Sequence, residues 1–218
     1  MSWIASATAI KMVGAKPVFI DVNAHGLIDP AEVEPAITSK TAAIMVVDYS
    51  GKIAAMEELE QIAEKHDLLL IEDAAQAFGA TRKGRRAGQF GVISCFSMNP
   101  MKVLGAFGEA GMVTTDTAEI RDRLIELRYN GMRDRKISIQ PSINARIDTL
   151  HAATMLVQLE EFPEKLDRRR SIAARYSAQI DPEIITPYGE DNCTDTFFCY
   201  AIRTKNRDPR AKFLIENG

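Results

Sequence analysis

Residues 68–77 read LLLIEDAAQA and give the strongest indication of the fold. The apolar start of this stretch does not alternate with polar residues, which is typical of a strand covered on both faces of a parallel sheet. Open α/β sheets bind ligands at the carboxyl ends of their strands, so Glu72 and Asp73 stand where a site is expected. Successive strand residues point to opposite faces, so at most one of the two carboxylates faces a given ligand. Capping of a following helix is the alternative role for either residue.

Four more short apolar runs predict strands of the same kind, at residues 17–20, 42–47, 92–96 and 112–114. Between two of them, residues 56–66 carry Leu59, Ile62 and Ala63 on one helical face, which predicts an amphipathic crossover helix. A strand, helix, strand unit of this length makes its two strands parallel neighbours. The sequence therefore predicts an α/β fold with a mostly parallel sheet.

Three further helices follow in the second half of the chain. One is expected from Ala118 to about Tyr129 with Ile120, Leu124 and Leu127 inward, and one begins after Asp148. The inward residues of this second helix are Leu150, Ala153, Leu156 and Val157. A basic helix resumes after the interruption at Pro163, and residues 196–203 predict one more strand. We therefore expect residues 1–162 to form most of an α/β domain and residues 163–218 to begin a second.

The basic run Arg168–Arg170 within that last helix has two interpretations. It could bind phosphate, or it could form a solvated helix face, and the acidic residues on either side favour the second interpretation.

Composition narrows the class of protein. The chain has 218 residues, with 27 Lys and Arg against 30 Asp and Glu, giving a net charge of −3, which argues against a strongly basic nucleic-acid binder. No apolar stretch approaches the roughly 20 residues of a membrane span, and no signal peptide is evident. The three cysteines and the three histidines lack the spacing of disulfide frameworks or metal sites. A cytoplasmic protein without a membrane partner, a nucleic-acid partner or a metal is therefore expected.

A lysine stands within an otherwise apolar segment, residues 95–105, which read CFSMNPMKVLG. Lys102 has Met101, Val103 and Leu104 as sequence neighbours, and poor solvation of its charged form lowers the pKa of an amine. Such a lysine is a candidate nucleophile toward a carbonyl carbon. The commoner alternative is a lysine that extends its ammonium to solvent.

Several segments, taken in order, resemble one known family. EDAAQA at residues 72–77 precedes a Phe-Ser-x-x-x-x-Lys pattern ending at Lys102, and GEAG follows at residues 108–111. Together with SATAI at 6–10, GAKPVFID at 14–21 and NARIDTLHAA at 144–153, they resemble the DegT/DnrJ/EryC1/StrS sugar aminotransferases. The resemblance implies a fold type I pyridoxal-phosphate enzyme. It implies an incomplete large domain with a mostly parallel sheet, followed by the start of a smaller C-terminal domain.

The resemblance also implies roles for five residues. Lys102 matches the lysine that binds the cofactor covalently and then transfers protons. Asp73 matches the carboxylate that pairs with the pyridinium nitrogen, and Gln76 matches a side chain that anchors the cofactor ring. Ser97 matches a hydroxyl donor to the cofactor phosphate. Asn144 resembles a residue that reaches the phosphate from the neighbouring subunit, which implies a homodimer.

The implied reaction moves an amino group from glutamate to a nucleotide-linked keto-sugar, with pyridoxal 5'-phosphate as cofactor. Two alternatives stay open: a pyridoxal-phosphate-dependent dehydratase acting on the same sugars, and an inactive truncated chain. The sequence departs from many family members at Asp48 and Phe198, where those members have histidine. It also lacks counterparts of the family's N-terminal stretch and most of its C-terminal domain, so we expect the central part of a longer enzyme.

Overall fold

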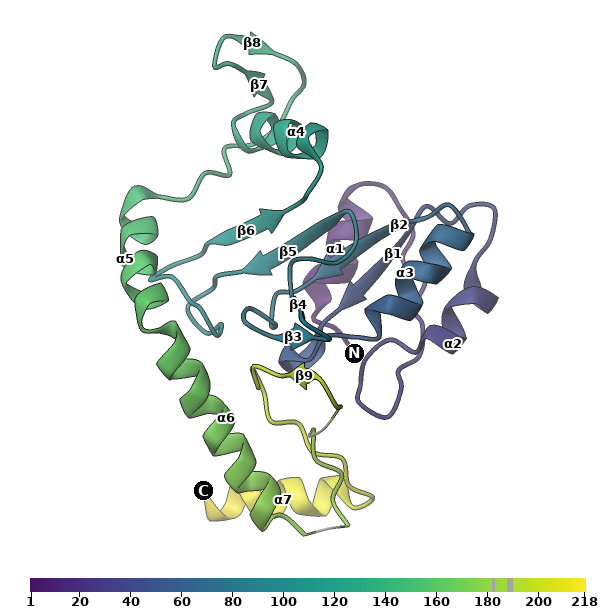
Figure 1. The fold of residues 1–218 in the computed structure, drawn as a ribbon, viewed down its shortest axis with the longest axis vertical. Coiled ribbons are helices and arrows are strands. Elements are labelled where there is room, and N and C mark those ends of the chain that lie inside the picture. Colours follow the sequence, from purple (N-terminus) through teal and green to yellow (C-terminus); the bar gives the residue numbers. More distant parts are fainter. Residues whose placement is uncertain (182, 188–189) are drawn as a thin grey trace.

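A computed structural model describes residues 1–181, 183–187 and 190–218. Its centre is a four-stranded sheet in the order β1 (Ala43–Val47), β2 (Leu69–Asp73), β5 (Ile93–Ser97) and β6 (Gly111–Thr114) (Figure 1). β1, β2 and β5 are parallel, whereas β6 runs antiparallel to β5. The predicted α/β fold with a mostly parallel sheet is confirmed, and so are four of the five apolar runs.

Two predicted strands are wrong. Residues 17–20 are extended but pair with no strand in the described part of the chain, and Val18 and Phe19 are 64% and 77% exposed. Residues 196–203 form no strand because their backbone follows the turn at 49–51 instead, with Phe198 N donating to Ser50 O at 2.9 Å. A short strand lies just before them. It is β9 (Cys193–Thr194), which pairs antiparallel with β3 (Thr81–Arg82), and β3 also pairs with β4 (Arg85–Arg86).

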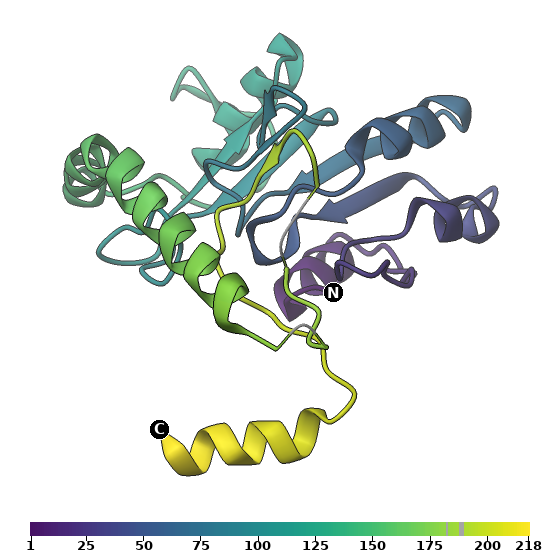
Figure 2. The same cartoon turned by 60° about the horizontal axis from the view of Figure 1, so that its bottom comes forward.

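Helices cover the two faces of the sheet. α1 (Ile4–Met12) lies on one face and α3 (Met56–Lys65) on the other (Figures 1 and 2). The predicted crossover helix is confirmed, since α3 buries Met56, Leu59 and Ala63. Its apolar face packs onto a core that includes Val46, Leu70, Phe90 and Met98, whereas α1 buries none of its residues. Smaller elements complete this half: α2 (Pro30–Val33) and the short 3-10 turns η1 (Glu34–Ala36) and η2 (Tyr49–Gly51).

The helices after the sheet exist as predicted, but their apolar faces are less buried than expected. α4 (Ala118–Arg128) lies beyond the β6 edge, next to β7 (Met132–Arg133) and β8 (Ile137–Ser138) (Figure 1). Its Ile120, Leu124 and Leu127 are only partly buried, and Glu126 is its one buried residue. In α5 (Thr149–Glu160), Leu150, Leu156 and Val157 are 73%, 65% and 59% exposed. These faces stay open because no described element packs against them closely enough to cover them.

The long helix α6 (Phe162–Gln179) returns to the core. Its Phe162 and Leu166 belong to the main hydrophobic cluster, and Pro163 lies in its first turn, where proline is tolerated. α7 (Arg207–Asn217) projects away from the rest of the molecule (Figure 2). None of the helices in the described ranges is long and apolar enough to cross a membrane.

Candidate active site

The ends of two parallel strands place the first site residues. β2 and β5 are neighbours with Asp73 opposite Cys95, so Asp73 and Ser97 both leave the sheet at the same edge. Asp73 is half-buried. Its Oδ2 accepts a 2.6 Å hydrogen bond from Ser6 Oγ, and its Oδ1 accepts one of 3.2 Å from Ala75 N. Ser6 lies within the family-like segment 6–10, but nothing in the sequence indicated this contact.

The two adjacent carboxylates do face opposite sides of the sheet, as predicted. Glu72 is completely buried and accepts hydrogen bonds from Gly88 N, Phe90 N and Ser94 Oγ. Asp73 instead faces the α1 side, where Ser6 holds it. A turn follows Asp73 in place of the helix that the capping alternative requires. Asp73 is therefore the carboxylate available to a ligand.

Gln76 is held against the turn at 49–51. Its Oε1 accepts a 2.6 Å hydrogen bond from Ser50 N, and its carbonyl oxygen accepts one of 3.0 Å from Thr196 Oγ1. Gly51 has φ of 90°, and a Cβ built there would lie 2.1 Å from Thr196 Oγ1. Only glycine fits this left-handed position, so the turn and residue 196 are packed together at the site.

The Lys102 side chain contacts an aromatic ring. Its ammonium lies 4.6 Å from the centroid of the Phe198 ring, and the backbone N of Phe198 is bound to Ser50 O. The expected apolar surroundings are present only in part, because Leu104 is buried but Met101 is 79% exposed. A cation over an aromatic face is attracted by the ring, so Phe198 supplies a partner that the neighbours of Lys102 in sequence do not indicate.

Ser97 stands at the start of the loop that carries the lysine. Its Oγ accepts a long hydrogen bond of 3.4 Å from Asn99 N, and Lys102 N donates to Asn99 O at 2.8 Å. Asn99 also donates from Nδ2 to Glu109 Oε1 at 2.7 Å, which ties the loop to the residues before β6. The Ser97 hydroxyl proton is directed at no acceptor in the described part of the chain.

Two arginines and a buried ion pair hold the segment that presents Phe198. Arg169 Nη1 donates to Phe197 O at 3.2 Å, and Arg170 Nε donates to Asp195 O at 3.1 Å. Lys52 Nζ lies 2.9 Å from Asp195 Oδ2, and burial raises the pKa of Asp195 although the Lys52 charge opposes that rise. Neither phosphate binding nor a solvated helix face fully describes Arg168–Arg170, because Arg169 and Arg170 donate hydrogen bonds to backbone carbonyl oxygens.

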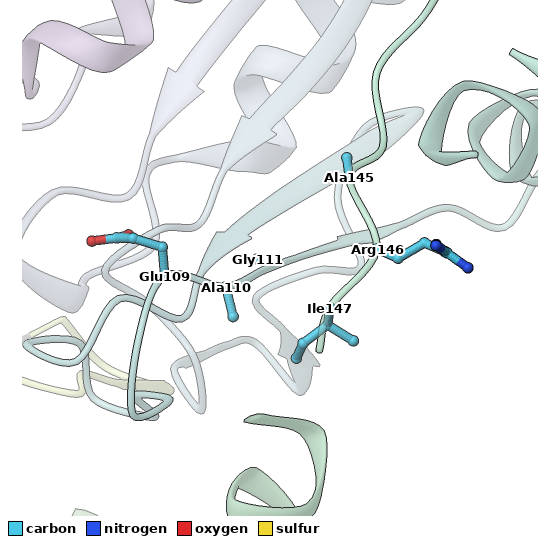
Figure 3. A pocket seen from close by; sticks show the side chains of 6 residues that line it. All are labelled: Glu109, Ala110, Gly111, Ala145, Arg146 and Ile147. Atoms are coloured by element: carbon cyan, nitrogen blue, oxygen red, sulfur yellow. The ribbon is translucent and has the colours of Figure 1, made fainter. Parts of the chain in front are cut away.

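Asn144 forms no hydrogen bond with the other four predicted residues in the described part of the chain. It is exposed, and its Oδ1 accepts a 2.9 Å hydrogen bond from Arg146 Nε. The segment that follows it borders a shallow hollow of about 280 Å³, lined by Glu109, Ala110, Gly111, Ala145, Arg146 and Ile147. Figure 3 shows Glu109 and Arg146 pointing in opposite directions from this hollow. Within the described residues of one chain, then, Asp73, Gln76, Ser97 and Lys102 gather at one sheet edge without Asn144.

Comparison with known proteins gives consistent matches over the whole chain. The DegT/DnrJ/EryC1/StrS aminotransferase family matches residues 1–218. The chain is 36% identical over 222 residues to a protein of Geobacillus stearothermophilus named pleiotropic regulatory protein, covering 100% of this chain and 60% of that protein. It is 39% identical over 220 residues to the dTDP-3-amino-3,6-dideoxy-alpha-D-galactopyranose transaminase of Aneurinibacillus thermoaerophilus, again covering 100% and 60%.

A solved structure agrees with these matches. The X-ray structure of S. venezuelae DesV in complex with a ketimine intermediate superposes with a TM-score of 0.93 at 34% identity, covering 99% of this chain and 59% of that chain. The chain thus spans about 60% of the length of the curated relatives named above.

Proposed function

Because the chain belongs to the DegT/DnrJ/EryC1/StrS aminotransferase family, we propose that the whole protein transfers an amino group from glutamate to a nucleotide-linked keto-sugar with pyridoxal 5'-phosphate. The observation that carries this proposal is the arrangement of Asp73, Ser97 and Lys102 at one edge of the sheet. The relative from Aneurinibacillus thermoaerophilus is named as a transaminase of a dTDP-linked amino sugar, which supports a nucleotide-linked substrate.

The residues at the edge fit the chemical groups of this cofactor. Each oxygen of the Asp73 carboxylate accepts one hydrogen bond from Ser6 or Ala75 and keeps a second lone pair for a ring N–H. The Ser97 hydroxyl has a proton to donate to a phosphate oxygen. The Lys102 side chain is half-buried, with its amine over the Phe198 ring, and the amine can bind an aldehyde carbon. A carboxylate, a hydroxyl and an amine at one edge form the donor set that a phosphorylated pyridine aldehyde requires.

Each residue then has one task in the proposed reaction. When bound, pyridoxal phosphate supplies a ring that accepts electrons from the carbon bearing the amino group. Asp73 holds the proton on the ring nitrogen by its negative charge, and Ser6 keeps that carboxylate oriented. Lys102 Nζ first binds the cofactor and then moves protons at the reacting carbon as a general base. Gln76 anchors the ring side of the site, held by the hydrogen bond from Ser50 N in the turn at 49–51.

The proposal extends to assembly and domains. We infer a homodimer in which Asn144 reaches the phosphate of the neighbouring subunit, since Asn144 is exposed and its side chain pairs with Arg146 rather than with the other proposed site residues of its own chain. The open apolar face of α5 supports such a contact. Residues 1–162 would form the large cofactor-binding domain and residues 163–218 the start of the small one. The free cysteines in the described ranges agree with a reducing compartment such as the cytoplasm.

Borohydride reduction followed by peptide mapping tests the assignment of Lys102. Reduction of the cofactor-loaded protein should leave pyridoxal phosphate covalently attached to the peptide that contains Lys102, and Lys102→Ala should lose both the label and turnover. Lys83→Ala, which changes a lysine that is 56% exposed, is the matched control and should keep both. Label on any other lysine would overturn the assignment.

Product analysis separates aminotransferase from dehydratase. With a nucleotide keto-sugar and glutamate, the aminotransferase yields an amino sugar and 2-oxoglutarate in equal amounts. A deoxy keto-sugar formed without loss of glutamate would identify the dehydratase. Absence of both products, together with absence of cofactor uptake by the same preparation, would support the inactive-chain alternative.

A further inference from the structure

Two carboxyl groups are buried together on the α3 side of the sheet. Asp48 and Glu72 both have no solvent-exposed surface. Val46 lies opposite Glu72 in the β1–β2 ladder, so Asp48, two residues after Val46, points to the same face as Glu72. These residues lie behind the candidate site, since Asp73 points to the other face.

Glu72 is surrounded by hydrogen-bond donors. Gly88 N lies 3.0 and 2.9 Å from its two oxygens, and Phe90 N and Ser94 Oγ donate to Oε2. A proton on either of these oxygens would point at a donor that already points at it. Glu72 is therefore the hydrogen-bond acceptor of the pair.

Asp48 presents the complementary pattern. Its Oδ1 accepts a 3.1 Å hydrogen bond from Ala54 N, but its buried Oδ2 has no hydrogen-bond partner among the residues that the structure describes. A buried polar atom without a partner is costly, and a second negative charge next to Glu72 would add repulsion in a poorly solvated interior. A proton on Oδ2 removes both costs, because it neutralises Asp48 and supplies the missing donor.

We propose that Asp48 and Glu72 share one proton, which is carried on Asp48 Oδ2 and donated to the Glu72 carboxylate. The pair lies on the opposite face of the sheet from Asp73 and fixes the position of Asp73. The link to Asp73 is direct, since Asp48 N donates to Asp73 O at 3.0 Å and Glu72 precedes Asp73 in β2. Sharing one proton limits the total charge of the Asp48–Glu72 pair, next to Asp73, to −1. Asp48 and Glu72 are thus positioning residues that act through Asp73.

The surroundings of the pair agree with this assignment. Burial, and then the negative charge of Glu72, raises the pKa of Asp48 well above its ordinary value, and the charge of Asp73 adds to the rise. Cys95 on β5 lies opposite Asp73 and therefore points to the other face of the sheet. Burial, followed by the charges of Asp73 and Glu72, raises the pKa of its thiol, which keeps it neutral. The positive charge of the Arg85 guanidinium on β4 attracts the Glu72 carboxylate electrostatically, but its hydrogen bonds, of 2.7 and 2.8 Å, are formed with Glu60.

The pH dependence of stability tests the proposal without any cofactor. A carboxyl whose pKa is higher in the folded protein binds more protons than the unfolded chain above about pH 4, so stability falls as pH rises toward the folded pKa. The folding equilibrium constant should fall about tenfold per pH unit relative to Asp48→Asn. The Asn variant cannot titrate, but its amide still donates to Glu72 and still accepts from Ala54. Urea unfolding of both proteins between about pH 5 and pH 8 measures the ratio.

A reciprocal variant assigns the proton to one partner. Glu72→Gln turns an amide donor toward Gly88 N and Ser94 Oγ, so it should be destabilised at every pH, whereas Asp48→Asn should fold. Infrared spectra should show a protonated-carboxyl carbonyl band in the original protein that is lost in Asp48→Asn. Parallel pH curves for the original protein and Asp48→Asn, failure of Asp48→Asn to fold, or tolerance of Glu72→Gln would each overturn the proposal. These readouts are independent of whether the aminotransferase assignment holds.

Discussion

Ser6 on helix α1 donates a 2.6 Å hydrogen bond to Oδ2 of Asp73 at the end of β2, across 67 positions of sequence. A hydroxyl donor to an ionised carboxylate gives a short, charge-assisted bond. The bond fixes the direction of the carboxylate proposed to pair with the cofactor ring. It also ties a helix that buries none of its residues to the centre of the sheet.

Removing this donor should weaken cofactor binding. Ser6→Ala leaves Asp73 with the Ala75 N–H as its remaining donor, and a hydrogen bond to a charged group contributes about 1.5–3 kcal/mol when well formed. We expect a loss of about tenfold in affinity for pyridoxal phosphate, measured by absorbance titration. Ser2→Ala is the control, since Ser2 Oγ donates to Ser6 Oγ and does not contact Asp73. Equal losses in both variants would show that the bond to Asp73 has no role in binding.

Neutralising Asp73 should affect rate more than binding. Asp73→Asn keeps the shape of the side chain, but an amide cannot hold the ring proton by charge, so turnover should fall by roughly 10²-fold or more. Cofactor binding should stay measurable. Asp122→Asn changes a carboxylate that is 64% exposed on α4 and should keep full turnover. Turnover close to that of the original protein in Asp73→Asn would reduce Asp73 to a residue that caps a turn.

The turn at Gly51 should not tolerate a side chain. Gly51→Ala combines a φ of 90° with a Cβ 2.1 Å from Thr196 Oγ1, and overpacking of this kind costs about 1–3 kcal/mol beyond the backbone strain. Gly84 has a φ of 81° and no atom within 4 Å of a built Cβ, so Gly84→Ala measures the strain alone. Urea unfolding should show the larger loss for Gly51→Ala. Similar losses would mean that Thr196 moves aside freely.

The buried ion pair between Lys52 and Asp195 should be costly to break from one side. Their side chains are 7% and 9% exposed, and removal of one partner from a buried pair typically costs about 3–5 kcal/mol. Lys52→Met should therefore destabilise strongly. Lys52→Met combined with Asp195→Leu should recover most of the loss, because no buried charge remains unpaired. A double variant less stable than Lys52→Met would contradict this account.

Acidic pH should restore part of the stability that Lys52→Met loses. Burial already raises the pKa of Asp195, and loss of the Lys52 charge raises it further. A carboxyl with a raised folded pKa binds a proton that the unfolded chain has released, so stability increases as pH falls toward about 4. The Lys52→Met protein should be least stable near neutral pH and regain stability on acidification, measured by unfolding at several pH values.

Local patterns in the sequence were enough to predict the central sheet and the order of the site residues along it. Apolar runs at 42–47, 68–71 and 92–96 became strands with buried residues. The run at 112–114 also became a strand, paired with β5, although its Met112 and Val113 stay exposed. Residues 17–20 have the same pattern but pair with no strand among the described residues, so the pattern alone could not decide their state. A strand requires hydrogen-bond partners, which lie elsewhere in the chain.

The contacts between the site residues depend on how distant segments pack in the folded chain. Ser6 donates a hydrogen bond to Asp73, the Lys102 ammonium lies over the Phe198 ring, and Asp48 interacts with Glu72. The two members of each pair are brought together by the register of the sheet or by a loop that packs back against it. Residue types and periodicity describe what a segment can bury. Which side chain lies opposite which other depends on how the segments pack in three dimensions, and no local pattern contains that information.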